Sequence, residues 1–288
     1  MTDIRIGISG WTYAPWRGDF YPEGLPHKRE LAHAASIFNS VEVNGTFYGL
    51  QRPAAFAQWF DATPDDFVFA VKGSRYITHM LKLKEPLAPL ANFMASGVLR
   101  LGPKLGPILW QFPPFFRFDE AKLAAFLTLL PQTGAAASLI ARKHDHRLKD
   151  RAWLRIDRDH RLRHAVEIRH ESFRDPAFTR LLRRHNVALV CADTVEWPLL
   201  MDLTADFVYV RLHGSTELYR SGYGRAALDR WARRVSAWSQ GKPMTDGAFI
   251  DAAASKPRKR DVYVYFDNTD KRRAPDDARG LMRRLGMP

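Results

Sequence analysis

Short runs of apolar, β-branched and aromatic residues recur along this chain, and stretches with helical spacing separate most of them. Several runs are almost continuously apolar, which is typical of strands covered on both faces. Eight runs predict strands, at Ile4–Gly10, Ser40–Thr46, Phe67–Gly73, Gly106–Phe112, Ala165–His170, Ala188–Ala192, Phe207–Gly214 and Val262–Asn268. Alternation of strands with helices favours a parallel sheet, and eight strands favour its closure into a barrel.

Amphipathic segments predict the helices, at 28–38, 53–60, 120–130, 176–185, 226–238 and 276–285. The chain of 288 residues exceeds the length of about 250 residues that one (β/α)₈ barrel needs, and no boundary divides it. We therefore predict an α/β fold, a single (β/α)₈ TIM barrel over residues 1–288. Only about a dozen residues join the sixth and seventh strands, too few for a full helix. We expect irregularity there, with a short or degenerate helix.

Composition adds a cellular setting to this fold. The chain has one cysteine, Cys191, so an intrachain disulfide is excluded and a secreted scaffold is disfavoured. The opening residues enter a strand-like run without an apolar signal stretch, and no apolar run reaches the length of a membrane span. These features predict a cytoplasmic protein that does not interact with a membrane.

Charge is distributed unevenly between the two halves. Residues 1–140 carry 13 Lys and Arg against 11 Asp and Glu, whereas residues 141–288 carry 31 against 20, a net charge of +11. Such a surface attracts nucleic acid or steers phosphorylated substrates. An arginine-rich composition without a ligand explains it equally well, and composition alone does not show whether the charges converge.

Polar residues gather where the predicted strands end. Period-two alternation places Glu42 with Asn44, Glu167 with Arg169, and Arg211 with His213 on shared faces. Outward faces of a barrel meet apolar helices, so these sets should point inward, with each carboxylate paired to a cation. Inward polar residues at strand ends build the active site of this fold. The other strand-end candidates for substrate binding are Lys72, Gln111, Asp193, Asp267 and Asn268. The alternative is an ion-pair plug that fills the barrel mouth.

His213 is the leading candidate for acid–base chemistry, because imidazole titrates near neutral pH. Glu42 or Glu167 could serve if burial raised its pKa. Glu42, Glu167, Asp193, His213 and Asp267 are also ligand types for a divalent metal, although no metal-binding motif is present and the interleaved cations would neutralise the carboxylates. The cofactor therefore stays open. Cys191 fits a core position better than a nucleophile.

Two loops suggest ligand contacts. Residues 219–225, which include Tyr219 and Tyr223, precede a predicted helix, and their glycines and arginines suit an anion. The aromatic segment 10–22, which includes Trp11, follows the first strand and suits stacking on a base or a sugar ring. A turn and a hydrophobic plug are the corresponding structural interpretations.

The sequence resembles the DUF72 or YecE-like family of barrels over nearly its whole length. The matching segments are Gly10–Tyr13, Phe20–Pro22, Val41–Tyr48, Phe69–Lys72, Thr78–His79, Leu109–Pro114, Glu167–His170, Arg211–Gly214, Tyr219, Tyr223 and Phe266–Asn268. The resemblance implies the barrel fold and assigns no activity. Barrels of this kind have been likened to metal-dependent endonucleases, but the carboxylate–histidine cluster of such enzymes is not evident here.

The leading hypothesis is an enzyme acting on a phosphate-bearing substrate, either nucleic acid or a nucleotide. Lys72, Arg169 and Arg211 would hold anionic oxygens while His213 with Glu42 or Glu167 moves a proton. One alternative is an isomerase or hydrolase of a sugar or polyol. The other is a non-catalytic nucleic-acid-binding protein that uses Arg258, Lys259 and Arg260.

Overall fold

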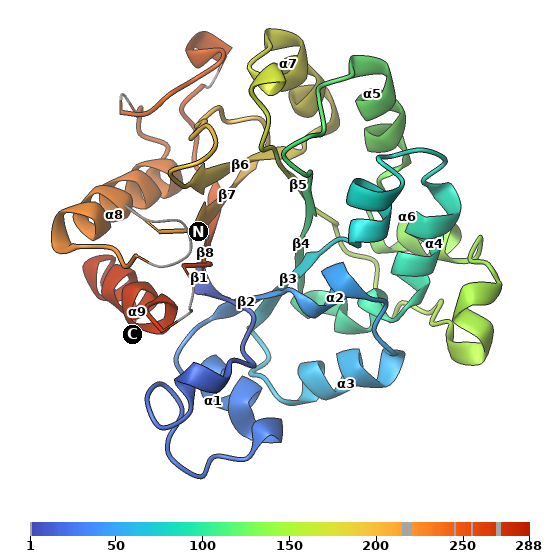
Figure 1. Ribbon diagram of the computed structural model, residues 1–288, viewed down its shortest axis with the longest axis horizontal. Helices are drawn as coiled ribbons and strands as arrows, with labels where there is room; N and C mark the ends of the chain where they lie inside the picture. The colour runs from blue at the N-terminus through green and yellow to red at the C-terminus, as the bar shows by residue number, and fades with distance from the viewer. Residues whose placement is uncertain (1, 215–220, 245, 255, 269–271) are drawn as a thin grey trace.

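The predicted barrel is present. A computed structural model describes residues 2–214, 221–244, 246–254, 256–268 and 272–288. Its strands are all parallel and form a closed barrel in chain order, in which β8 pairs with β1 (Figure 1). The strands are β1 (Ile4–Ser9), β2 (Ser40–Val43), β3 (Val68–Lys72), β4 (Leu105–Gln111), β5 (His164–Glu167), β6 (Ala188–Asp193), β7 (Phe207–Leu212) and β8 (Asp261–Phe266).

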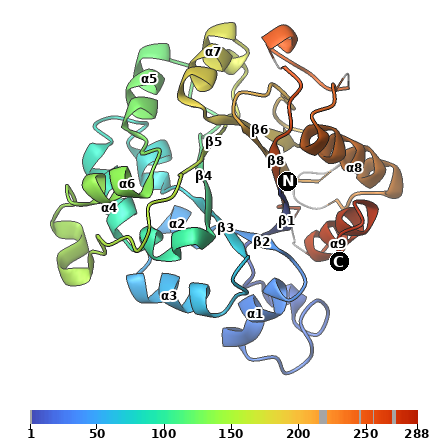
Figure 2. The same cartoon turned by 180° about the vertical axis from the view of Figure 1, so that it is seen from behind.

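Helices surround the strands on the outside (Figures 1 and 2). They are α1 (Glu30–Ala35), α2 (Gly45–Tyr48), α3 (Pro53–Asp61), α4 (Leu87–Ala95), α5 (Glu120–Leu129), α6 (Gly134–Ala141), α7 (Pro176–His185), α8 (Arg225–Gln240) and α9 (Ala274–Arg284). A π-helical segment (Tyr76–Met80) follows β3, and short 3₁₀ segments join several elements. Within the described chain, no helix is long and apolar enough to cross a membrane.

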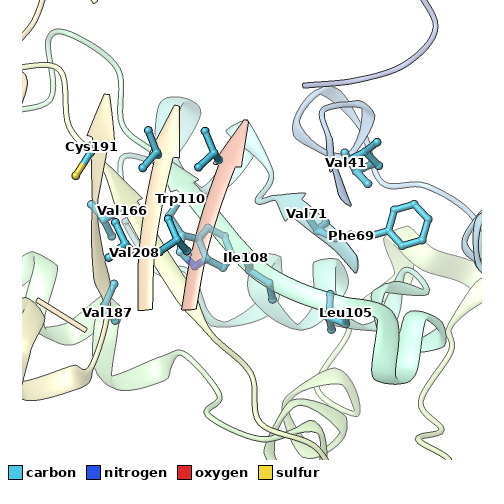
Figure 3. Close-up of a cluster of buried hydrophobic side chains, with 14 of the residues drawn as sticks. Val41, Phe69, Val71, Leu105, Ile108, Trp110, Val166, Val187, Cys191 and Val208 are labelled. Carbon is cyan, nitrogen blue, oxygen red and sulfur yellow. The ribbon is translucent and has the colours of Figure 1, made fainter. Parts of the chain in front are cut away.

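Side chains alternate between two packed regions. The outer faces of the strands carry branched and aromatic residues that pack against the helices, among them Val41, Phe69, Ile108 and Trp110 (Figure 3). Cys191 belongs to this outer layer, where burial raises the pKa of its thiol to about 12, so it is a core residue rather than a nucleophile. The inner faces form a separate cluster of small residues and tyrosines. Polar side chains take over the inner face toward the carboxyl ends of the strands.

The connection from β6 to β7 is irregular, as expected, but it contains no helix of any length. The chain instead pairs with a segment that precedes β8. Leu200 forms a parallel bridge with Ala248, and both carboxylate oxygens of Asp202 accept backbone N–H groups, from Ile250 and Asp251, at 2.8 Å. Met201 in the connection also donates its backbone N–H to the carbonyl of Ala248 at 2.9 Å, so each of the two loops satisfies backbone groups of the other.

Close approach of β1 and β2 depends on Gly7, because a Cβ there would lie 1.8 Å from the carbonyl oxygen of Ser40. We expect Gly7→Ala to lower the free energy of unfolding by about 3 kcal/mol, because the added carbon would clash with backbone atoms of the neighbouring strand, which are fixed by the sheet. Urea unfolding followed by circular dichroism measures the change. Gly49→Ala is the matched control, because nothing lies within 4 Å of the added carbon. Equal stability of the two variants would contradict this account.

Candidate active site

The centre of the site is the guanidinium of Arg211, which points inward from β7 and is fully buried. Its Nε and Nη2 donate to the two carboxylate oxygens of Glu42, at 3.0 and 2.9 Å. Nη2 also donates to Asp267 at 2.8 Å. Nη1 donates to Glu167 at 2.6 Å and lies 3.5 Å from Nε2 of His213. Burial alone would lower the pKa of Arg211, but the carboxylates outweigh it and raise this pKa well above its usual value. Arg211 therefore organises the site, because its N–H donors are directed at protein acceptors.

Both carboxylate oxygens of Glu42 likewise accept hydrogen bonds from groups of the protein. Its side chain is fully buried, and Oε1 accepts from the hydroxyl of Ser9 as well as from Arg211. Oε2 accepts from Arg211 and from the hydroxyl of Tyr209 at 2.6 Å. Burial and the nearby Glu42 raise the pKa of Tyr209 well above its usual value, so the phenol keeps its proton and remains a donor. The position of Glu42 favours holding Arg211 over exchanging a proton with a ligand.

Glu167 lies between two arginines. Oε2 accepts from Arg211, and Oε1 accepts from Nε of Arg169 at 2.9 Å. Burial alone would raise the pKa of Glu167, but Arg211, Arg169 and His213 together hold it well below its usual range. Glu167 therefore stays ionised near neutral pH, which favours an orienting role for it as well.

His213 is enclosed at the end of β7. Its Nδ1 lies 3.3 Å from Oδ2 of Asp267, and its Nε2 lies 3.8 Å from Oε2 of Glu167. Trp197, from the connection between β6 and β7, packs edge-on against the imidazole, with ring centroids 5.6 Å apart. The same indole stacks on the guanidinium of Arg169 at 4.1 Å. A carboxylate against one ring nitrogen and an indole packed edge-on against the ring fix the orientation of the imidazole.

Cations gather at the side of the mouth near β3. Lys72 is 8% exposed, and its Nζ lies 4.3 Å from the ring centre of Phe47. Burial, followed by repulsion from Arg211, lowers the pKa of Lys72 to about 8, although the surrounding carboxylates oppose this. His79 also packs against Phe47, in an edge-to-face arrangement with ring centroids 5.0 Å apart. Burial, followed by repulsion from Lys72, Arg169 and Arg75, lowers the pKa of His79 to about 4. We call Lys72, Arg75 and Arg169 the cationic cluster. His79 lies among these cations as a neutral group.

Two amides complete the inward set. Gln111 is 5% exposed on β4, directly across from Glu167 in the sheet register. Asn44 follows β2 and donates from Nδ2 to the hydroxyl of Ser9 at 2.9 Å. The amide oxygens of Gln111 and Asn44 are enclosed and accept no hydrogen bond from any residue that the structure describes. Enclosed acceptors of this kind are costly unless water or a ligand satisfies them.

The structure brings together most of the predicted site residues, on shared inward faces. These are Glu42, Asn44, Lys72, Gln111, Glu167, Arg169, Arg211, His213 and Asp267. Trp11 lies beside them in the loop after β1, 5.4 Å from the ring of Trp59. Tyr219 lies outside the described residues, as does Arg220 of the predicted anion loop.

Three predicted residues do not face the mouth. Asp193 accepts from the indole N–H of Trp231 on α8, at 2.9 Å. Asn268 donates to Asp277 on α9 at 2.6 Å, and Tyr223 is buried with its ring against Phe266. The Tyr223 hydroxyl accepts from the N–H of Gly214 at 3.1 Å. Asp193 therefore connects the end of its strand to α8, and Asn268 connects the end of its strand to α9.

Arg75, His79 and Trp197 were not predicted from the sequence, because they lie in connections that no periodicity places. The Thr78–His79 pair was among the family motifs, which was the available signal for His79. The sequence gives no comparable signal for Trp197, which lies in the helix-free connection between β6 and β7.

The candidate metal ligands are separated by the same arrangement. No three His, Cys, Asp or Glu side chains of the described residues are grouped in a way that could hold a metal ion. Arg211 occupies the position between Glu42, Glu167 and Asp267 that a cation would need. Asp193 points to α8 instead.

One arginine of the basic segment before β8, Arg260, has a structural role. Arg260 is 5% exposed, and its Nε donates to the carbonyl of Ala205 at 2.9 Å. Its Nη1 donates to the carbonyls of Lys256 and Arg258. Arg260 therefore supports its own loop, and only Arg258 and Lys259 of the proposed nucleic-acid contacts are exposed.

Comparisons with known proteins agree with this fold. The family model described as "Protein of unknown function DUF72" matches residues 5–288. The UPF0759 protein YecE of Escherichia coli is 25% identical over 256 residues, which cover 82% of each chain. The UPF0759 protein YunF of Bacillus subtilis is 30% identical over 129 residues, and that match spans 42% of this chain and only 44% of YunF.

Solved structures give the same architecture. A DUF72 family protein of Thermotoga maritima superposes with a TM-score of 0.73 at 24% identity, covering 99% of both chains. Another, from Enterococcus faecalis, gives a TM-score of 0.68 at 18% identity, over 99% of this chain and 96% of that one. At these identities the likeness establishes the barrel alone.

Removal of Arg211 would leave buried carboxylates without their counter-ion. We expect Arg211→Met to lower the free energy of unfolding at pH 7 by about 3–5 kcal/mol. The native pKa of Glu167 is depressed, so its contribution is present above the usual carboxyl pKa and is lost as pH falls. The deficit of the variant should therefore shrink toward pH 4, as urea unfolding at several pH values would record. Adding Glu42→Gln should restore part of the stability. A deficit that does not change with pH would contradict this electrostatic explanation.

Proposed function

The chain belongs to the DUF72 family, and on that premise we propose that it is an enzyme acting on a phosphate-bearing substrate at the carboxyl ends of the barrel strands. The observation that carries the proposal is the cationic cluster. Neither Lys72 nor Arg75 forms an ion pair with any described residue, although both lie beside the mouth. Lys72 is buried, and a buried cation without a carboxylate partner favours an anionic ligand, while the exposed Arg75 adds a second positive charge beside it.

The balance of charge supports the same conclusion. Glu42, Glu167 and Asp267 are held by Arg211, and Arg169 adds a second cation on Glu167. Lys72 then makes the inward charges equal in number, and Arg75 adds one positive charge at the rim. A phosphate group would meet Lys72, Arg75 and the outer edge of Arg169. Arg211 would position the carboxylates, since its donors are already engaged.

Proton transfer falls to His213 in this proposal, and Glu42 and Glu167 become positioning residues. His213 is the inward imidazole among the carboxylates, and Asp267 against its Nδ1 would stabilise the imidazolium that forms. Lys72, with its pKa lowered to about 8, is a second group able to give up a proton in the physiological range. The enclosed amide oxygens of Gln111 and Asn44 would orient donors on the substrate.

Anion binding should depend on the ionisation of Lys72. Its ammonium is charged below about pH 8 and neutral above it, so affinity for a phosphate ester should weaken as pH rises through that value. Ribose 5-phosphate is a suitable probe, because its phosphate does not titrate between pH 7.5 and 10, and calorimetry gives the dissociation constant. Lys72→Arg should keep its affinity to pH 10, whereas Lys72→Met should bind at least 10-fold more weakly at pH 7.5. Lys122→Met, which alters a lysine exposed on α5, is the control. A pH-independent affinity in the unaltered protein would argue against the assigned role.

Turnover should separate the proposed proton carrier from its support. With a substrate found by thermal-shift screening of sugar phosphates, nucleotides and unphosphorylated sugars, His213→Gln should lower kcat by about 10²–10⁴-fold and leave affinity nearly unchanged. His146→Gln, at an exposed position, should have no effect. Stabilisation by unphosphorylated sugars alone would support the sugar or polyol alternative. Full activity in His213→Gln would remove the proton-transfer role.

A further inference from the structure

An aromatic cavity of about 390 Å³ lies beside the barrel mouth, between the loop after β1 and the segment after β2. Its walls include Trp11, Tyr13, Asn44, Tyr48, Gln51 and Trp59. Trp11 and Trp59, which both line the cavity, meet edge to face with ring centroids 5.4 Å apart. The hydroxyl of Tyr13 donates to the carbonyl of Ser9 at 2.9 Å, which anchors the aromatic loop to the end of β1. The volume lies in the range of small-molecule sites, about 300–1,000 Å³.

Asn44 connects this cavity to the charged network. The single hydroxyl proton of Ser9 is donated to Glu42, so the Ser9 oxygen acts as an acceptor toward Asn44. The amide of Asn44 must therefore turn its NH₂ group to Ser9, which leaves its oxygen on the other side. That oxygen is enclosed and has no hydrogen-bond partner among the described residues, and Asn44 lines the cavity. A residue of the cavity wall thus carries an enclosed, oriented acceptor that has no donor among the described residues.

The cavity also adjoins the cationic cluster. The guanidinium of Arg75 lies 5.3 Å from the ring centre of Tyr48, which is 67% exposed and lines the cavity. Phe47, the preceding residue, contacts Lys72 and His79. One short helix, α2, therefore presents an aromatic residue to the cavity and another to the cations. A ligand in the cavity would place a substituent beside Lys72 and Arg75.

The wall chemistry selects a flat, weakly polar ring. None of the residues recorded along this cavity is charged. A sugar needs a polar partner for nearly every carbon, whereas a heteroaromatic base needs faces to stack on and a few partners at its edge. An enclosed amide oxygen suits the exocyclic amine or ring N–H of such a base. Stacking on tryptophan and tyrosine supplies the remainder of the recognition.

We propose that this cavity binds the base of a nucleotide whose phosphate lies on the cationic cluster. This inference rests on the proposed function and names its substrate class. Tyr48, Trp59 and Trp11 stack on the base, the Asn44 oxygen accepts from its edge, and Lys72 and Arg75 bind the phosphate. A nucleotide that is free and one within a nucleic-acid strand present the same chemistry to this site.

The test compares dissociation constants by calorimetry for adenosine 5′-monophosphate, adenosine, ribose 5-phosphate and a single-stranded oligonucleotide. We expect the monophosphate to bind about 10-fold or more tightly than ribose 5-phosphate. Tyr48→Ala should remove most of that advantage, because the exposed ring stacks on the base and ribose 5-phosphate has no base to lose. Asn44→Ala should weaken the monophosphate several-fold. If the oligonucleotide binds more tightly than the monophosphate, the nucleotide belongs to a nucleic-acid strand. If the monophosphate binds more tightly, the nucleotide is free, and either result supports a base site.

The matched control is Trp153→Ala. Trp153 also pairs with an arginine, since Arg100 lies 4.1 Å from its ring centre, and it lines a different cavity of about 340 Å³. This variant should bind every probe as the unaltered protein does. Equal affinity for the monophosphate and ribose 5-phosphate, both lost in Lys72→Met, would overturn the base site and leave the proposed function standing. Binding of adenosine as tightly as its monophosphate, insensitive to Lys72→Met, would keep the base site and overturn the phosphate role.

Discussion

The ion pairs between Arg211 and the carboxylates of Glu42, Glu167 and Asp267 are the interaction on which the mouth of this barrel depends. These groups come from β2, β5, β7 and the end of β8, so a single guanidinium joins strands on opposite sides of the barrel. Each of these charges would be costly to bury alone. The charged groups pair with one another, and the hydroxyls of Ser9 and Tyr209 donate further hydrogen bonds to Glu42. These interactions hold the strand ends in one arrangement.

This arrangement divides the polar groups at the mouth into those engaged within the protein and those outside that network. The donors of Arg211 and the acceptors of Glu42 are engaged within the protein. Lys72 and Arg75 lie outside that network, and Gln111 and Asn44 keep an enclosed oxygen without a described partner. The two interpretations of the sequence are therefore compatible, because the ion-pair plug is present and the proposed binding groups lie around it.

The sequence predicted the barrel, its strands and most of the inward charges, because period-two alternation in a buried strand leaves little choice of face. The same alternation places Asp193 and Asn268 on the outward face, because they lie two residues after the outward residues Cys191 and Phe266. It would therefore have excluded both from the inward set. Helices α4 and α6 were missed for different reasons. Nearly all of α4 is buried, so it lacks a polar stripe, and α6 is a short alanine-rich segment within a basic stretch. Arg75, His79 and Trp197 lie in connections, whose course depends on tertiary packing that no local pattern records.

The missing helix between β6 and β7 shows how such packing reaches the site. A helix there would have carried its own backbone hydrogen bonds and packed outside the sheet. In the observed connection the backbone N–H of Met201 instead donates to the carbonyl of Ala248, and the carboxylate of Asp202 accepts the N–H groups of Ile250 and Asp251. With this course of the chain, Trp197 lies at the mouth of the barrel and contacts both Arg169 and His213. An irregularity that looks like a defect of the fold thus supplies the indole that covers the imidazole and orders the guanidinium. Variation of this connection among barrels of the same core would change the covering of the site without disturbing the network centred on Arg211.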